Sequence, residues 1–379
     1  MKLIVACVIF FLVYFIQSFL YDRYWNKNLR INIAFEEQYV SEGMKSYLIE
    51  TVENDKALPI PLLHVKFATT RYFLFQKETN TQISDQFYRH NLYSIAPHQK
   101  ITRKYPFFCA KRGYYPITRA DVVSRNLFLS DLLAAQYTCD TAIFVLPQIL
   151  TESSIPESIR TSLQTIVHKS AHIEDPFEFK GIREYQPYDN YRMINWKSTA
   201  RTNQLQVNTH FPTTFYEVDI LLNLDTQVLA HADILQEKSI RIAYTIASLL
   251  CSSHASFRLI SNGLDCFTQQ PCVHKVGGGS NHLKQLGIAL SRIDLTKPIE
   301  NFTNVLTEYS KQATYQRQSI LISNNRKKDI QIAYKTLQQK NLSCLYLIPE
   351  FANIPVEETL GINRTVWEVN YDEKTVSNL

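Results

Sequence analysis

The chain opens with an apolar run that is too long and too uniform for an ordinary surface helix. Residues Leu3–Leu20 carry no charge, and only Gln17 and Ser18 are polar. A helix of about 18 residues is just long enough to cross the hydrocarbon core of a bilayer. No small-residue cleavage site follows, and the bulky segment Tyr21–Trp25 comes directly after the run. We therefore expect a retained transmembrane anchor over residues 1–24 rather than a cleaved signal peptide.

The charges around the anchor predict its orientation. Lys2 precedes the apolar run, whereas Arg23, Lys27 and Arg30 follow it. Cytoplasmic flanks of membrane helices carry the excess of Lys and Arg, so the body is expected on the cytosolic side. The seven cysteines are scattered and odd in number, which is typical of reduced thiols. These features predict a single-pass protein of the cell membrane with a cytosolic body.

A shortage of glycine removes the common nucleotide-binding and hydrolase motifs. The chain has only 9 glycines in 379 residues, and the average share is about 7%. No G-x-x-x-x-G-K-[ST] loop occurs, and Gly277 and Gly279 are followed by His282 where G-x-G-x-x-G needs its third glycine. G-x-S-x-G, H-E-x-x-H and C-x-x-C are also absent. We predict no catalytic residue and no cofactor.

Residues 31–150 have the pattern of an all-β domain. Leu29, Ile31 and Ile33 alternate with polar neighbours, as in a half-buried strand. Turn signals recur along the segment, and no long apolar helix pattern interrupts it. The apolar run Ala142–Leu146 is expected to be the last strand, because Pro147 ends it. Short strands joined by regular turns predict an immunoglobulin-like β-sandwich.

Residues 215–352 have a different rhythm, in which strands and helices alternate. The apolar run Val218–Asp225 suits a parallel strand buried on both faces, and residues 232–254 repeat their apolar side chains with a helical period. Further strands are expected at 257–260, 318–323 and 344–348, with helices near 279–293, 299–313 and 327–340. This alternation predicts an open α/β sheet, followed by a C-terminal tail at 353–379.

The linker between these domains, residues 151–214, begins with a polar and partly helical stretch. His168 and His172 lie four residues apart, so on a helix they would share a face, with Glu174 nearby. Such a pair is a candidate metal or catalytic site. A solvated helix face is the simpler interpretation, because no other residue supplies the remaining ligands.

The same linker contains the densest cluster of charged and aromatic residues, over Phe177–Arg201. Arginine guanidinium groups bind carboxylates through two hydrogen bonds and stack on aromatic rings. The cluster is therefore interpreted as a clasp between the two domains or as a partner-binding surface. A catalytic alternative would use Asp189 with Arg183 and Arg192, but no nucleophile lies beside a base.

The spacing within this segment resembles the signature of the bacterial domain-of-unknown-function family 58. The matching residues, in order, are Gly181, Arg183, Tyr185, Asp189, Arg192, Ile194, Trp196, Ala200 and Arg201. Many fixed positions at fixed spacing make the match specific, and the order of anchor, sandwich and α/β domain extends it over essentially the whole chain. The chain departs from the pattern at Tyr188, where the family has glycine, which puts the backbone shape of that turn in question.

The resemblance implies a function of interaction rather than catalysis. Members of the family resemble membrane-anchored proteins whose C-terminal domain is similar to a von Willebrand factor A domain. Their genes commonly lie beside those of MoxR-type AAA ATPases and transglutaminase-like membrane proteins. By this resemblance, the chain is expected to be a non-enzymatic adaptor whose partners are the bilayer and a MoxR-type ATPase.

Domains of the von Willebrand factor A type can bind Mg²⁺ through a D-x-S-x-S loop after the first strand. Asp225 occupies the first position here, but Gln227 and Leu229 replace the two serines. Mg²⁺ requires oxygen ligands in octahedral geometry, so this loop predicts no metal, and Asp225 is the one candidate ligand. Asn324 and Asn325, expected on an exposed loop after a later strand, offer amides in place of acidic groups.

One alternative function stays open beside the adaptor. An exported module that binds a surface ligand would use the same two domains, and Cys266 and Cys272 would then be expected to be oxidised. An enzyme with an unrecognised site is the remaining alternative. Nucleic acid is not expected as a partner, because the net charge is only +5.

Overall fold

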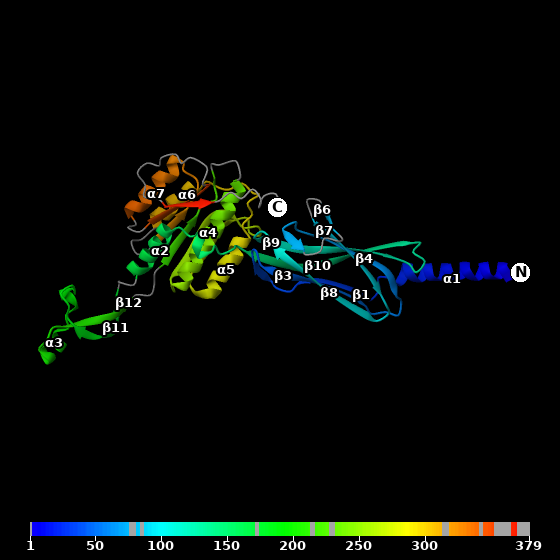
Figure 1. Cartoon of the computed structure of the whole chain (residues 1–379), viewed down its shortest axis with the longest axis horizontal. Helices are drawn as coiled ribbons and strands as arrows, with labels where there is room; N and C mark the ends of the chain where they lie inside the picture. The colour runs from blue at the N-terminus through cyan, green and yellow to red at the C-terminus, as the bar shows by residue number, and fades with distance from the viewer. Residues whose placement is uncertain are drawn as a thin grey trace. The chain divides into compact units, whose positions relative to one another are not determined.

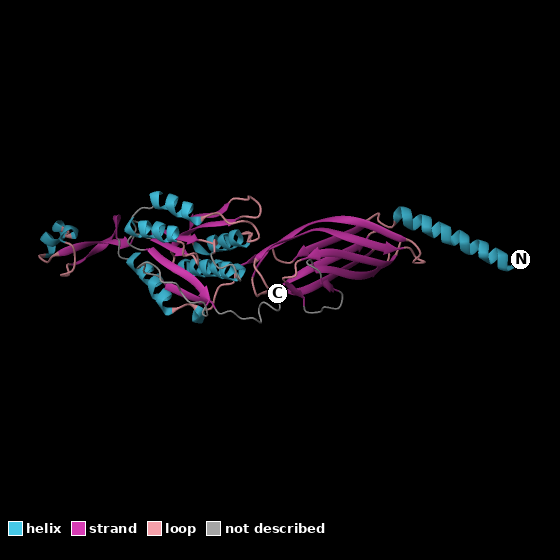
Figure 2. Cartoon of the chain, turned by 90° about the horizontal axis from the view of Figure 1, so that it is seen from above, coloured by secondary structure: helices cyan, strands magenta, loops and turns pink. Residues whose placement is uncertain are grey.

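The computed structural model describes residues 2–75, 81–83, 87–170, 174–212, 217–226, 232–312, 318–340, 344–351 and 365–369. The chain divides into two compact units that adjoin in the sequence between Gln148 and Ile149. The first unit holds an N-terminal helix and a β-sandwich. The second holds an α/β sheet and a separate β-hairpin (Figures 1 and 2).

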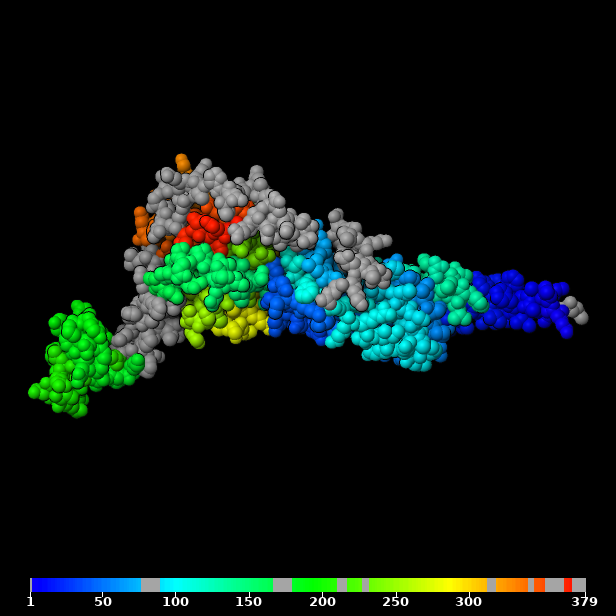
Figure 3. Space-filling view, in the orientation of Figure 1, coloured from blue at the N-terminus to red at the C-terminus, as the bar shows by residue number. Residues whose placement is uncertain are grey.

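The N-terminal apolar run forms helix α1 (Lys2–Tyr24), uninterrupted by glycine or proline. It is the one described helix that is long and apolar enough to cross a membrane, judged by length and composition, which confirms the predicted apolar helix. Its buried side chains, Gln17 and Tyr21, lie on one face, and the Tyr21 hydroxyl donates to the Pro59 carbonyl at 2.8 Å. Most of the other apolar side chains of α1 are exposed, and Figure 3 shows those of the face in view in dark blue.

Residues 29–146 form a β-sandwich, which confirms the predicted fold of this segment. The first sheet has the order β1-β3-β8-β5 and the second the order β2-β10-β9-β4-β7-β6. All described pairings are antiparallel except that of β2 with β10. The strands are β1 (Leu29–Phe35), β2 (Tyr39–Ser41), β3 (Lys45–Asn54), β4 (Ile60–Thr69), β5 (Phe73–Phe75), β6 (Thr81–Ile83), β7 (Phe87–Ile95), β8 (Gln99–Cys109), β9 (Gly113–Arg125) and β10 (Leu132–Leu146).

The sandwich strands are longer than their turn signals suggest. β10 ends before Pro147 as predicted, but it begins at Leu132 and spans 15 residues. A register shift between Thr138 and Thr141 interrupts its pairing with β9 and lets the pairing continue on both sides. The core between the sheets combines aliphatic side chains with aromatic ones, and the ring centroids of Phe73 and Phe107 lie 4.5 Å apart.

The second unit contains a six-stranded sheet of order β15-β14-β13-β16-β17-β18. Its neighbours run parallel, except that β15 is antiparallel to β14. The strands are β13 (Glu217–Leu222), β14 (Ser256–Leu264), β15 (Pro271–Gly277), β16 (Gln318–Ile322), β17 (Cys344–Phe351) and β18 (Thr365–Val369). The helices are η1 (Glu152–Ser154), α2 (Glu157–Ser170), α4 (Ala232–Ser252), α5 (Gly279–Ser291), α6 (Phe302–Gln312) and α7 (Lys328–Lys340).

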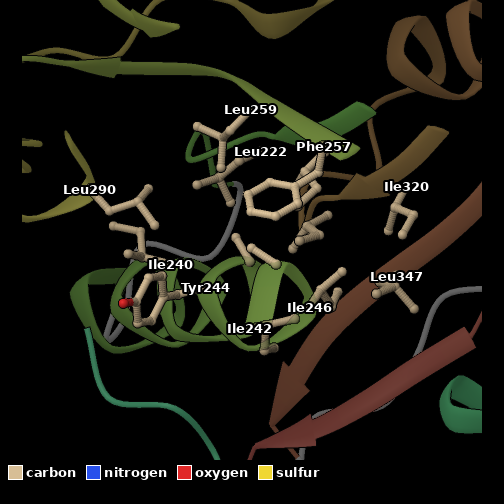
Figure 4. Packing of buried hydrophobic residues seen from close by; sticks show 14 of the residues in the cluster. Leu222, Ile240, Ile242, Tyr244, Ile246, Phe257, Leu259, Leu290, Ile320 and Leu347 are labelled. Carbon is tan, nitrogen blue, oxygen red and sulfur yellow. The ribbon is translucent and has the colours of Figure 1, made fainter. Parts of the chain in front are cut away.

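Helices cover both faces of this sheet (Figure 1). Along β13, Ile220 and Leu222 pack into the core shared with α4 and α5, whereas Leu221 packs against α6 and α7. Burial on both faces explains why β13 reads as a continuous apolar run rather than an alternating one. Figure 4 shows Leu222 opposite side chains of α4 such as Ile240. Each such side chain contributes about 1.5–3 kcal/mol when it leaves water.

The structure extends the α/β core beyond the predicted boundaries on both sides. α2, expected in the linker, contributes Ile159 and Leu163 to the core beneath the sheet. Beyond residue 352, where a tail was expected, β18 pairs with β17 and buries Trp367. The helix α2 itself was expected in the linker, but its packing against the sheet was not predicted, because only a few of its side chains are apolar. β18 was not predicted because it is only five residues long.

Candidate partner-binding surface

The signature segment lies in a β-hairpin that has its own two-stranded sheet, here called the arm (residues 174–212). β11 (Glu174–Glu184) pairs with β12 (Gln206–Pro212), and the connection contains η2 (Tyr191–Met193) and α3 (Trp196–Thr202). A small apolar contact holds the base of the connection, where buried Ile194 forms a β-bridge with buried Val207. The arm thus organises its signature residues with side chains of its own.

An ion pair shapes the turn that follows β11. The two terminal nitrogens of Arg183 each donate to a different oxygen of Asp189, both at 2.6 Å. The Gln186 amide donates to the same carboxylate at 2.8 Å, and the Asp189 amide donates to the Gln186 carbonyl at 2.9 Å. Donation from Arg183 holds the pKa of Asp189 below its usual range. This carboxylate is therefore engaged as a structural acceptor.

Tyr188 stands where the family 58 signature has glycine, and its backbone does not adopt a left-handed conformation in this turn. It is not among the described non-glycine residues with positive φ. The turn closes through Asp189 and Gln186 instead. This turn does not require glycine, so Tyr188 is compatible with its backbone conformation.

Asparagine side chains fix the rest of the connection. The Asn195 side chain accepts from the Ser198 amide at 2.9 Å and so caps the start of α3, and it donates to Asn208 at 2.8 Å. Asn203 ends α3 in the left-handed conformation, and Asn190 accepts from the Arg192 amide. These polar contacts rigidify a segment that has almost no apolar core.

The arm exposes large aromatic side chains. Tyr188, Tyr191 and Trp196 are 82%, 72% and 68% exposed, and the Tyr191 ring stacks on that of Tyr185 at 5.8 Å. The side chains of Arg192, Lys197 and Arg201 are exposed as well. Exposed Trp, Tyr and Arg on a braced scaffold form the composition that is enriched at the centres of protein interfaces.

A second polar group lies at the carboxyl end of the parallel sheet, around the predicted metal ligand. The Asn325 side chain donates to Asp225 at 2.6 Å, and Asn223 accepts from the Asp225 amide and from the Asn262 side chain, both at 2.9 Å. The Lys327 ammonium lies 4.0 Å from the Asp225 carboxylate. The Asp225 carboxylate therefore accepts from an amide N–H and lies near a cation, and neither group can be an oxygen ligand of a metal ion.

No group of three or more His, Cys, Asp or Glu side chains that could hold a metal ion occurs in the described part of the chain. The expectation that Asn325 lies on an exposed loop was wrong, because it is fully buried by its contacts with Asp225 and Tyr346. Gln227, Leu229 and His172 lie outside the described residues. His168 lies in α2, but because His172 is not described, the predicted pairing of the two histidines cannot be compared with the structure.

Sequence reasoning missed a polar cluster inside the sandwich. Glu50 of β3 is fully buried and accepts from the Asn91 side chain of β7 at 2.6 Å. The buried Arg89 guanidinium lies over the rings of Phe75 and Tyr105, at 4.2 and 4.1 Å. Burial raises the pKa of Glu50. The available signal was the period of β3, which places Glu50 on its inward face.

Comparison with known proteins finds solved structures that are similar to only about a third of the chain. No protein-family model matches the sequence, and no curated protein is significantly similar to it. Among solved structures, a type II cohesin domain from the cellulosome of Acetivibrio cellulolyticus is 11% identical, with 31% of this chain and 95% of that one covered and a TM-score of 0.24. The CARDB domain of a Pyrococcus furiosus protein is also 11% identical, with 30% and 90% covered and a TM-score of 0.20. Likenesses at these scores bear on neither the identity nor the function of the chain.

Proposed function

We propose that the chain is a membrane-anchored, non-enzymatic adaptor that binds a partner protein through the arm. The observation that carries the proposal is the exposed aromatic and arginine surface of the arm, in a connection whose first turn is held by the Arg183–Asp189 pair. A rigid surface binds at lower entropic cost, and burial of Tyr or Trp is the commonest source of binding energy in interfaces. High exposure of Trp196 favours a partner surface over a buried clasp between domains.

The partner proposed is a MoxR-type AAA ATPase, with a transglutaminase-like membrane protein in the same system. The support is the resemblance of the signature residues to family 58. The strand order, with parallel strands and one antiparallel edge strand, supports a C-terminal domain of the von Willebrand factor A kind.

A non-enzymatic role is supported by the state of the signature carboxylate. Asp189 already accepts three hydrogen bonds from Arg183 and Gln186. A carboxylate held in this way is a poor general base, since its proton affinity is lowered. A hydrolase screen in which Asp189→Asn abolishes a wild-type activity would contradict this part of the proposal.

The binding experiment uses the full chain in detergent micelles and the purified MoxR-type ATPase of the same organism. Trp196→Ala is expected to weaken binding about 10-fold or more, the loss typical of an interface hot spot. The matched control is Ile332→Ala, which truncates a similarly exposed apolar side chain on α7. Equal binding by all three proteins would refute binding through the arm, and no binding of the wild type would refute the ATPase as the partner.

The proposed orientation places the body in the cytosol. Arg23, Lys27 and Arg30 after the anchor support it. A cysteine introduced at the exposed Lys328 tests it by labelling with a membrane-impermeant maleimide. Labelling only after the membrane is breached is expected, whereas labelling of intact cells would place the body outside and favour an exported binding module.

A further inference from the structure

The turn that joins β9 to β10, here called the tip (residues 126–132), exposes an unusual amount of apolar surface. Its members Leu127, Phe128, Leu129 and Leu132 are 53%, 44%, 48% and 64% exposed. Turns of this kind are ordinarily made of small and polar residues, since water surrounds them. A contiguous apolar patch on a turn marks a site of contact with a protein or a membrane.

The tip lies beside the N-terminal helix, at the level of the apolar run. The Phe128 ring centroid is 6.0 Å from that of Phe10 and 5.9 Å from that of Tyr14. The Tyr14 hydroxyl donates to Ser130 at 3.1 Å, and the Ser18 hydroxyl donates to Asp131 at 2.6 Å. Figure 3 shows the tip against the blue side chains of α1. These contacts fix the depth of the tip relative to the helix.

The length of α1 leaves no way to span a bilayer with the tip in water. At about 1.5 Å per residue, Tyr14 lies about 9 Å and Phe10 about 15 Å along the axis from Leu20, where the apolar run ends. The run itself measures about 27 Å, no more than the hydrocarbon core that it would cross. Since no residue of the run is spare, Phe128 lies below the membrane surface whenever α1 spans.

Several polar groups of the tip are hydrogen-bonded, which lowers the cost of moving them out of water into a membrane. The Leu129 amide donates to the Asn126 carbonyl at 3.0 Å, and the Ser130 amide donates to the Asn126 side chain at 2.9 Å. Arg125 donates to the Leu129 carbonyl at 2.8 Å. Asp131 pairs with Asn126 and Ser18 close to the end of the apolar run, where the polar headgroups begin.

We propose that the tip inserts into the acyl-chain region of the bilayer beside α1, so that the sandwich is held at the membrane by two elements. The proposal rests on the membrane anchor of the proposed function. The occupant of the apolar surface is lipid, because the surface is continuous with the exposed apolar side chains of α1. A two-point attachment restricts rotation of the sandwich about the helix axis.

The test measures quenching of tryptophan fluorescence in the full chain, reconstituted into phosphatidylcholine vesicles with brominated acyl chains. Phe128→Trp reports the tip and Phe11→Trp reports an exposed face of α1. Met44→Trp is the matched control, because Met44 is also exposed (60%) and lies on a turn at the opposite end of β10. The emission of the parent chain, which contains Trp25, Trp196 and Trp367, is subtracted.

Strong quenching at positions 11 and 128, with none at 44, is the expected result. Quenching at 11 while position 128 behaves like 44 would overturn the insertion and leave the anchor standing. An absence of quenching at 11 would refute the anchor, and the insertion with it. Lipids brominated at shallow and deep acyl positions add a second measure, in which position 128 is quenched at the depth between the boundary and the midplane.

Discussion

Arg183 and Asp189 form an ion pair with two hydrogen bonds that holds the turn following β11 in the arm. Each terminal guanidinium nitrogen donates to its own carboxylate oxygen at 2.6 Å, and the Gln186 amide completes the same acceptor at 2.8 Å. A planar fork can hold a carboxylate in one orientation, whereas an ammonium group cannot. The pair thereby positions the turn that displays Tyr188.

Arg183→Lys is expected to keep the charge and loosen the turn. A lysine makes one hydrogen bond to Asp189 where the arginine makes two, so the Gln186 and Asp189 amides should exchange with deuterium several-fold faster. The melting temperature of the whole chain should stay the same, because the pair is outside both domain cores. Lys104→Arg, at the exposed pair with Glu36, is the control. Unchanged exchange at both amides would show that the fork does not define the turn.

The burial of Glu50 between the sheets predicts a pH-dependent stability. Its raised pKa means that the folded chain binds the proton more tightly than the unfolded chain does. Stability is then lost as pH rises from the ordinary glutamate pKa, about 4.3, to the folded value. Glu50→Gln removes this titration. In that window, the unfolding free energy of the variant minus that of the wild type should therefore increase by up to about 1.4 kcal/mol per pH unit.

Urea unfolding of the full chain in detergent, at several pH values from 4 to about 8, provides the measurement. The difference between Glu50→Gln and the wild type should grow with pH and then level off. A difference that is constant over the whole range would mean that Glu50 ionises equally well in the folded and unfolded chains.

The sequence predicts the strands that are buried on both faces of the α/β sheet well, but it predicts the burial of polar residues at the carboxyl end of that sheet poorly. β13 reads as a buried parallel strand because Ile220, Leu221 and Leu222 are all apolar, which is a property of consecutive residues. The side chain of Asn325 reads as exposed, because its partner Asp225 is 100 residues away in the chain. Burial that depends on a distant partner has no local signature.

The pairing of β11 with β12 in the arm, a segment that the sequence predicts to be a linker, likewise has no local signature. A long connection, Tyr185–Leu205, joins β11 to β12. Because it is not a short turn, the sequence lacks the turn signal that marks a hairpin. The resemblance of the signature residues to family 58 is a prediction from spacing alone, because these residues lie within one stretch of sequence. The tip of the β9–β10 hairpin had a local signal, the run Leu127–Leu129 between polar residues, but apolar residues at a turn fit no strand or helix pattern.

The surroundings of Asp225 predict that divalent metal has no effect on stability. Mg²⁺ and EDTA should leave the thermal unfolding of the wild type unchanged, since Asn325 and Lys327 direct N–H groups at the carboxylate. Asn325→Asp replaces the donor with a second anion and should destabilise the fold by about 1–3 kcal/mol. Asn304→Asp on the exposed face of α6 is the control. A rise in melting temperature with Mg²⁺ in the wild type would contradict the interpretation.

The edge strand β18 predicts that the C-terminal region contributes to folding. Trp367 is 1% exposed and packs in the core below the sheet. Trp367→Ala should cost about 3–5 kcal/mol, the usual effect of emptying a large core site. Glu368→Ala, whose side chain is exposed on the same strand, should cost little. Equal unfolding midpoints in urea for the two variants would mean that residues 365–369 lie outside the cooperative unit.

The substitution Gly181→Ala tests whether this glycine is needed for folding of the arm or for binding of the partner. A Cβ at this position would meet only the Thr209 hydroxyl, at an ordinary contact distance of 3.8 Å, so Gly181→Ala should leave the arm folded. At Gly279, in contrast, φ is +83°, and Gly279→Ala should destabilise the start of α5 by about 1 kcal/mol. Hydrogen exchange reports folding of the arm, and binding to the ATPase is measured in parallel. If Gly181→Ala keeps normal exchange but weakens binding, the partner approaches the backbone closely at this point. Faster exchange throughout the arm would instead show that the glycine is needed for the hairpin itself.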